Sequence, residues 1–192
     1  IQAYNGGTSY LDDLLDRDIA CENTDKEIRN YVDALQNIVD IPRISGAGTG
    51  NSPYMMKYGA LTEIQSGSYV FSDTTYQVLA PNYQPVLRVL MTVLSRPTSD
   101  RVVCDAGFKA VGTEFDQPRV LGYPQMTGAR FSEEHLQWEV TEGKKPQVGE
   151  KICIIPSHSC TTVNLHQYLF VIEEDTIVDV WKITARDNWR HA

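Results

Sequence analysis

A histidine and a cysteine stand two residues apart in the stretch IIPSHSCTTVNLH, residues 154–166. On an extended segment, side chains two residues apart point to the same side, so the imidazole of His158 and the sulfur of Cys160 could meet on one ion. Nitrogen together with soft sulfur suits zinc. Two protein ligands would leave coordination positions open for water or substrate, as in catalytic metal sites.

Two other interpretations of this stretch stay open. A cysteine close to Ile and Pro residues can be a small core residue with no ion at all. A cysteine nucleophile with a histidine base is less well supported, because neighbours on one side of a strand offer no third group to orient the base. We leave His166 out of the metal pair and expect Cys153 in the core.

A second candidate is the glycine-rich loop SGAGTGN, residues 45–51, between an expected strand and an expected helix. Glycines let backbone N–H groups approach an anion closely, a threonine hydroxyl can donate, and a helix N-terminus adds positive charge. The loop therefore indicates a phosphate cup formed by Gly46, Gly48, Thr49 and Gly50. It matches neither the dinucleotide fingerprint nor the P-loop, and a flexible turn is the alternative.

Two further residues have side chains that could contact or bind a cofactor. Tyr4, in QAYNGGTS, is expected at the carboxyl end of a strand, where a β/α barrel binds its ligand; a buried tyrosine with an internal hydrogen bond is the alternative. Lys109, in DAGFKAV, lies in the β-rich half of the chain, so we do not expect it to form a Schiff base.

The elements that must position these residues differ between the two halves of the chain. Up to about residue 73, the pattern predicts strand, helix, strand, glycine turn, helix and strand, which is typical of parallel β/α units. The helix is expected over residues 24–39, with Thr24 as N-cap and an apolar face of Ile28, Val32, Leu35 and Val39. A short helix closed by Gly59 and a strand within residues 61–71 follow.

From about residue 86 to residue 181, short β-rich runs alternate with polar or Gly/Pro turns, which predicts an antiparallel β domain. The segment SDTTYQVLAPNYQP joins the two halves. Trp181, in VDVWKITAR, is expected to fill the core of this domain.

Composition excludes several classes of protein. The 192 residues are 42% hydrophobic and carry a net charge of -8, which argues against binding to nucleic acid or to an anionic membrane surface. No apolar run is long enough to span a bilayer. Four cysteines without a C-x-x-C pair fit a reducing, cytoplasmic compartment. The chain starts with Ile1, and we expect that the beginning of the protein is missing.

Taken in order, QAYNGG, GAGTG, LTEIQSGSYVFSD, VLSRP, DAGFKAV, SEEH, GEKICIIPSHSCTTVNLH and VDVWKITAR resemble the D-serine dehydratase and D-threonine aldolase family of pyridoxal-phosphate enzymes. That family is similar to alanine racemase in architecture. The resemblance implies an α/β plus all-β fold: residues 1–80 are the end of a cofactor-binding (β/α)8 barrel, and residues 81–192 are an antiparallel β domain with the metal motif.

The resemblance also assigns roles to residues. It implies that His158 and Cys160 bind a divalent metal, with zinc favoured by the cysteine and a manganese-like ion as the alternative. It implies pyridoxal 5'-phosphate as cofactor, bound by the residues Tyr4, Gly46, Gly48, Thr49, Gly50 and Tyr69. The family's Schiff-base lysine lies on an early barrel strand outside this chain, so no catalytic residue is assigned and the chain alone is expected to be inactive.

The implied function is that of a lyase acting on D-β-hydroxy-α-amino acids, in a homodimer. We expect a D-serine dehydratase that forms pyruvate and ammonia. D-threonine aldolase, which forms glycine and acetaldehyde, is one alternative, and a non-catalytic cofactor- or metal-binding fragment is another. No nucleic acid or membrane is expected as a partner.

Overall fold

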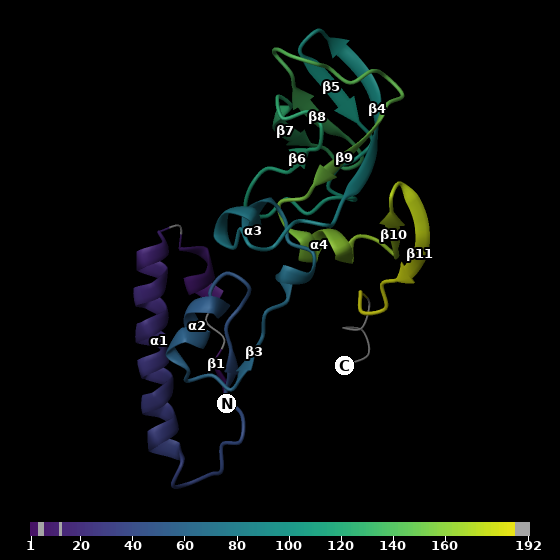
Figure 1. Cartoon of the computed structure of the whole chain (residues 1–192). Helices are drawn as coiled ribbons and strands as arrows, with labels where there is room; N and C mark the ends of the chain where they lie inside the picture. The colour runs from purple at the N-terminus through teal and green to yellow at the C-terminus, as the bar shows by residue number, and fades with distance from the viewer. Residues whose placement is uncertain (4–5, 12, 187–192) are drawn as a thin grey trace. The chain divides into compact units, whose positions relative to one another are not determined.

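The computed structural model describes residues 1–3, 6–11 and 13–186 (Figure 1). They divide into two compact units. Unit 1 comprises residues 1–72 and 76–84, and unit 2 comprises residues 73–75 and the chain from residue 85 onward. Tyr4, predicted to bind the cofactor, lies outside the described residues.

Unit 1 consists of short parallel strands and helices. Its three strands pair in the order β1-β2-β3, and both pairings are parallel. In chain order, the elements are β1 (Gln2–Ala3), the 3-10 helix η1 (Gly6–Tyr10), α1 (Leu14–Leu35), β2 (Ser45–Gly46), α2 (Ser52–Tyr58), β3 (Glu63–Ile64) and the 3-10 helix η2 (Ser68–Val70). The predicted alternation of parallel strands and helices is confirmed, although β3 is shorter than expected. Helix α3 (Thr74–Leu79) begins in unit 2 and ends in unit 1.

Helix α1 begins ten residues before the predicted N-cap at Thr24, at Leu14. The cap is Asp13, whose carboxylate accepts hydrogen bonds from the backbone N–H groups of Leu15 at 2.7 Å and Asp16 at 3.1 Å. This satisfies N–H groups that have no partner within the helix. Thr24 lies inside the helix, where its hydroxyl donates to the carbonyl of Ala20 at 2.9 Å. The predicted N-cap at Thr24 is therefore wrong.

The core of unit 1 is small. Ile28 is buried, as predicted, but Leu35 and Val39 are exposed because α1 ends at Leu35. The buried apolar side chains of this cluster are Cys21, Ile28, Ile44, Ala47, Met55 and Ala60. The predicted C-terminus of α2 is confirmed, since Gly59 caps the helix in the left-handed conformation with φ of 83°, which glycine adopts at little cost.

Unit 2 contains an antiparallel sheet, as predicted, with strand order β6-β9-β4-β5-β8-β7. Its strands are β4 (Val89–Thr98), β5 (Arg101–Cys104), β6 (Arg119–Val120), β7 (Thr127–Phe131), β8 (Leu136–Glu139) and β9 (Lys151–Ile155). Alternate residues of β4, β5, β8 and β9 point into one core, as expected for a sheet with one buried face. Trp138, Met91 and Ile154 are buried in that core.

After β9, the chain forms the short helix α4 (Ser159–Asn164) and a hairpin of β10 (Tyr168–Glu173) and β11 (Thr176–Lys182). Figure 1 shows this hairpin as a separate ribbon that follows α4. Trp181, predicted in the core, is 53% exposed on β11, because β10 and β11 pair only with each other in the described part of the chain. Across residues 1–3, 6–11 and 13–186, no helix has both the length and the apolar character of a membrane span.

Candidate functional site

The residues of the predicted metal pair lie where β9 gives way to α4. His158 is the N-cap of α4, with φ of -141°, and Cys160 is the second residue of the helix. The expectation that both stand on one extended segment is therefore wrong. A hydrogen bond with Cys160 is nevertheless the largest influence on the pKa of His158, which it raises.

The backbone around the pair is fixed by buried polar groups of unit 2. The carboxylate of Asp73 is fully buried and accepts a hydrogen bond from the N–H of Ser159 at 2.9 Å. The hydroxyl of Thr75 donates to the carbonyl of Ser157 at 2.8 Å, and the hydroxyl of Ser157 donates to the carbonyl of Glu114 at 3.0 Å. Buried polar groups that are paired in this way stabilise one arrangement of the loop.

The ring of His158 is enclosed on its Nδ1 side. Nδ1 lies 3.2 Å from the hydroxyl oxygen of Thr161 and 3.5 Å from the carboxylate of Glu114. Thr161 donates its hydroxyl proton to that carboxylate at 2.7 Å. The ring of Phe115 meets the imidazole edge-on, with 4.8 Å between ring centroids.

The pKa values in this cluster follow from these contacts. The hydrogen bond with Cys160 raises the pKa of His158, and burial opposes it. The hydrogen bond from Thr161 lowers the pKa of Glu114. These contacts therefore favour the ionised form of Glu114 and the protonated form of His158 relative to their ordinary pKa values.

The donor set fits a borderline-soft divalent ion. Imidazole nitrogen and cysteine sulfur are zinc ligands, and Cys160 is exposed whereas Cys21 and Cys104 are buried. Burial raises the pKa of Cys104 to about 12, so that thiol is a poor ligand near neutral pH. No group of three or more His, Cys, Asp or Glu residues within the described part of the chain could hold a metal. His158 and Cys160 would therefore act as a two-residue site with open positions.

The predicted phosphate loop follows β2 in unit 1 and is buried from Gly46 to Ser52. A Cβ on Gly50 would lie 2.6 Å from the carbonyl oxygen of Ser9, and one on Gly46 would clash with the carbonyl of Ala3. The side-chain amide oxygen of Asn51 accepts a hydrogen bond from the N–H of Gly48 at 2.7 Å. The loop therefore packs closely against the backbone of unit 1, and its role as a phosphate cup stays a prediction.

The structure brings Thr49 and Tyr69 together next to this loop. The N–H of Tyr69 donates to the hydroxyl oxygen of Thr49 at 3.1 Å, which leaves the hydroxyl proton of Thr49 able to donate elsewhere. The ring of Tyr69 packs against Tyr83, with 5.7 Å between centroids. A threonine donor in a glycine cradle suits a phosphate group, so the residues present fit the phosphate of pyridoxal phosphate.

Arg17 is a residue that sequence reasoning missed. Its guanidinium is buried and donates to the carbonyl oxygens of Gly50 at 3.3 Å, Leu79 at 2.6 Å and Leu11 at 3.0 Å. It thus ties the phosphate loop to two other segments of unit 1 and places a positive charge beside it. Nothing in the helical pattern around Arg17 marks this side chain as different from a surface arginine.

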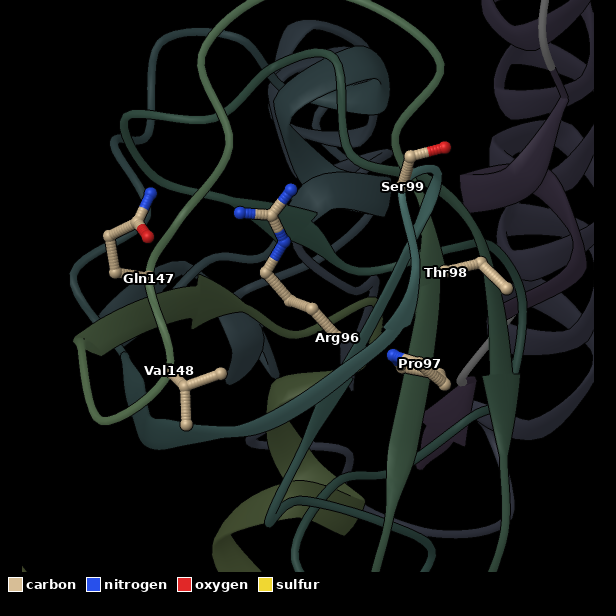
Figure 2. Close-up of a pocket in the computed structure, with 6 residues that line it drawn as sticks. All are labelled: Arg96, Pro97, Thr98, Ser99, Gln147 and Val148. Carbon is tan, nitrogen blue, oxygen red and sulfur yellow. The ribbon is translucent and has the colours of Figure 1, made fainter.

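The other candidates take no part in these two clusters. Lys109 forms exposed ion pairs with Glu133 at 3.2 Å and Glu134 at 2.7 Å. Nε2 of His166 lies 2.8 Å from the carbonyl oxygen of Ala110. An open pocket of about 620 Å³ contains none of the predicted site residues; Figure 2 shows its lining, Arg96, Pro97, Thr98, Ser99, Gln147 and Val148.

Comparisons with known proteins match both units. A model of the family described as "Putative serine dehydratase domain" matches residues 86–172. D-threonine aldolase of Arthrobacter sp is 33% identical over 97% of this chain and 51% of its own length. 3-Hydroxy-D-aspartate aldolase of Paracoccus denitrificans (strain Pd 1222) is 29% identical over 97% of this chain and 50% of its own length.

A solved structure agrees closely with the fold. The crystal structure of D-threonine aldolase from Filomicrobium marinum has a TM-score of 0.92 and 29% identity, over 97% of this chain and 52% of that protein. This confirms the predicted fold class, the C-terminal portion of a β/α barrel followed by an antiparallel β domain. The chain spans about half the length of the curated relatives that it matches.

Proposed function

The chain belongs to the D-serine dehydratase and D-threonine aldolase family, and from that premise we propose that it is part of a pyridoxal-phosphate- and metal-dependent lyase acting on D-β-hydroxy-α-amino acids. The observation that carries the proposal is the position of His158 and Cys160 at the start of α4, with an exposed thiol and with the intervening Ser159 anchored to buried Asp73. Such a pair suits an ion that must also contact a substrate.

In this proposal, residues of unit 1 bind the cofactor phosphate and residues of unit 2 bind the metal. Bound pyridoxal phosphate would supply an electron sink for charge at the substrate Cα, and a divalent ion a Lewis acid for its β-hydroxyl. We assign Gly46, Gly48, Thr49 and Gly50 to the phosphate, and His158 and Cys160 to the metal. Tyr69 would border the phosphate through its contact with Thr49.

Aldol cleavage is the reaction we favour. It breaks the Cα–Cβ bond of the substrate while the β-hydroxyl loses its proton, so that D-threonine gives glycine and acetaldehyde. Support comes from the relatives, because the Arthrobacter and Filomicrobium proteins are both D-threonine aldolases and match nearly the whole chain.

Dehydration is the second candidate, and it was the expectation from Cys160. It removes the Cα proton and the β-hydroxyl, so that D-serine gives pyruvate and ammonia. The match of residues 86–172 to a serine dehydratase domain favours it, because that range contains His158 and Cys160.

The test is product analysis with the full-length protein, supplied with pyridoxal phosphate and zinc or manganese. Glycine from D-threonine, abolished by a chelator and absent with L-threonine, would support the aldolase. Pyruvate from D-serine without glycine from D-threonine would support the dehydratase. No product from either substrate would indicate a non-catalytic binding protein. Because the chain spans about half of its relatives, we propose that the 192-residue chain alone gives neither product.

A further inference from the structure

The contacts of His158 point to two residues that have no role in the proposal above. We propose that Thr161 and Glu114 are positioning residues that hold His158 as the tautomer with hydrogen on Nδ1, so that Nε2 is the atom presented to the metal. This inference rests on the proposed metal role of His158. It names the donor atom and the groups that select it.

The hydrogen-bond donors and acceptors of Glu114, Thr161 and His158 determine which nitrogen of the His158 ring carries the hydrogen. A carboxylate can only accept hydrogen bonds, so the Thr161 hydroxyl at 2.7 Å must donate its single proton to Glu114. The Thr161 oxygen can then only accept from the imidazole nitrogen at 3.2 Å. Nδ1 must therefore carry a hydrogen, and in the neutral ring the lone pair is left on Nε2.

The backbone of unit 2 is built to allow this arrangement. A Cβ on Gly112 would clash with the Thr161 hydroxyl and would lie 2.9 Å from the carboxylate of Glu114, so a larger residue would have to displace these hydrogen-bonded groups. The N–H of Gly112 donates to the hydroxyl of Thr162 at 3.0 Å, and that hydroxyl donates to the carbonyl of His158 at 2.7 Å. The loop bearing Glu114 is thus tied to the turn bearing His158.

The backbone conformation of Phe115 is a second observation that supports a positioning role for this loop. It has a φ of 75°, which is rare and costly for a bulky residue. In this conformation its ring meets His158 edge-on at 4.8 Å. The carboxylate near Nδ1 and the tilted ring of Phe115 both restrict the imidazole, as groups around metal-binding histidines commonly do.

The competing explanation is that Glu114 and His158 form an ordinary surface ion pair without effect on the metal. Measurements of metal affinity distinguish this explanation from a positioning role. Loss of groups that orient a metal ligand lowers metal affinity about 10–100-fold. We expect this loss in Glu114→Ala and in Thr161→Val, measured as zinc affinity of the metal-free full-length protein by competition with a chromogenic chelator. Thr161→Ser keeps the hydroxyl, and Glu133→Ala removes an exposed carboxylate that pairs with Lys109, so both should bind zinc like the wild type.

A second measurement needs no variant except for assignment. Nitrogen-15 shifts of the imidazole in the metal-free protein, at a pH where His158 is neutral and assigned with His158→Ala, should show hydrogen on Nδ1. Hydrogen on Nε2 would overturn the inference, as would wild-type zinc affinity in both Glu114→Ala and Thr161→Val. If His158→Ala itself binds zinc like the wild type, the proposed metal site fails instead. The two failures are therefore distinguishable.

Discussion

The two units position their candidate site residues in different ways. In unit 2, the sheet carries a continuous core around Trp138, and the metal pair follows shortly after the end of β9, which lies between β6 and β4. In unit 1, the parallel strands have two residues each, and α1 leaves Leu14 and Leu15 59% and 67% exposed. The phosphate loop there depends on a few close backbone contacts and on Arg17. Unit 2 thus combines polar anchors such as Asp73 with a large apolar core, whereas unit 1 relies on polar anchors and close backbone contacts beside a small core.

The largest expected effect is in the core of unit 2. Trp138 is 1% exposed, so Trp138→Ala should lower the free energy of unfolding by about 3–5 kcal/mol, because it removes a large buried side chain and leaves a cavity. Urea unfolding followed by circular dichroism measures it. Trp181→Ala is the matched control on the exposed hairpin, with an expected change below about 1 kcal/mol. Equal losses in both variants would refute the contrast between core sheet and hairpin.

Replacing Arg17, the buried arginine that donates hydrogen bonds to the phosphate loop of unit 1, should have a smaller and more local effect. Arg17→Met leaves the carbonyls of Gly50 and Leu79 without their donor, at a cost of about 1–3 kcal/mol. The variant should also bind pyridoxal phosphate more weakly, in a titration followed by absorbance. Arg43→Met is the control, since the Arg43 side chain is exposed and forms a 3.9 Å ion pair with Glu63. Unchanged cofactor affinity in Arg17→Met would show that the loop does not depend on this anchor.

Gly50→Ala tests the loop itself. The added Cβ would lie 2.6 Å from the carbonyl oxygen of Ser9, so the loop must shift, and a cost of about 1.4 kcal/mol would weaken pyridoxal phosphate tenfold. The control is Gly67→Ala, whose Cβ would meet nothing within 4 Å. If both variants bind the cofactor equally well, the glycine loop does not hold the phosphate.

The smallest effect concerns acid stability of unit 1. Hydrogen bonds from Lys57 and Tyr58 lower the pKa of Asp18 below its ordinary 3.8. A lowered pKa means that Asp18 stabilises the fold above its unfolded-state pKa, and that this contribution disappears as the pH falls through the folded-state value. Asp18→Asn should therefore have a slightly lower Tm than wild type at neutral pH, and the difference should vanish in strong acid. A difference in Tm that does not change with pH would contradict this.

The sequence predicts those parts of the fold that rest on local pattern. Alternating apolar residues are enough to predict strands such as β4 and β9, and the glycine that ends α2 follows from backbone chemistry. The start of α1 was missed because Thr24 and Asp13 are both acceptable caps, and only tertiary packing chooses between them. Trp181 was misplaced because an apolar strand does not reveal whether anything packs against it.

The candidate site was predictable in its residue types but not in its geometry. His158 and Cys160 were identified from spacing and from the family resemblance, whereas the helix that begins between them was not expected. Glu114 is 47 residues away from Thr161 in the sequence, and no periodicity connects positions so far apart. Contacts of this kind depend on the register of β6 against β9, on the loop before β6 and on the turn after β9.

Metal content of the purified full-length protein tests the central claim most directly. Cys153 and Cys160 lie seven positions apart, but Cys153 is part of strand β9 and its pKa is raised by burial, whereas Cys160 is exposed beside His158. After loading with zinc and desalting, the wild type and Cys153→Ala should retain stoichiometric metal, and Cys160→Ala should lose it. Retention of zinc by Cys160→Ala, or its loss in a folded Cys153→Ala, would contradict the assignment of the metal pair.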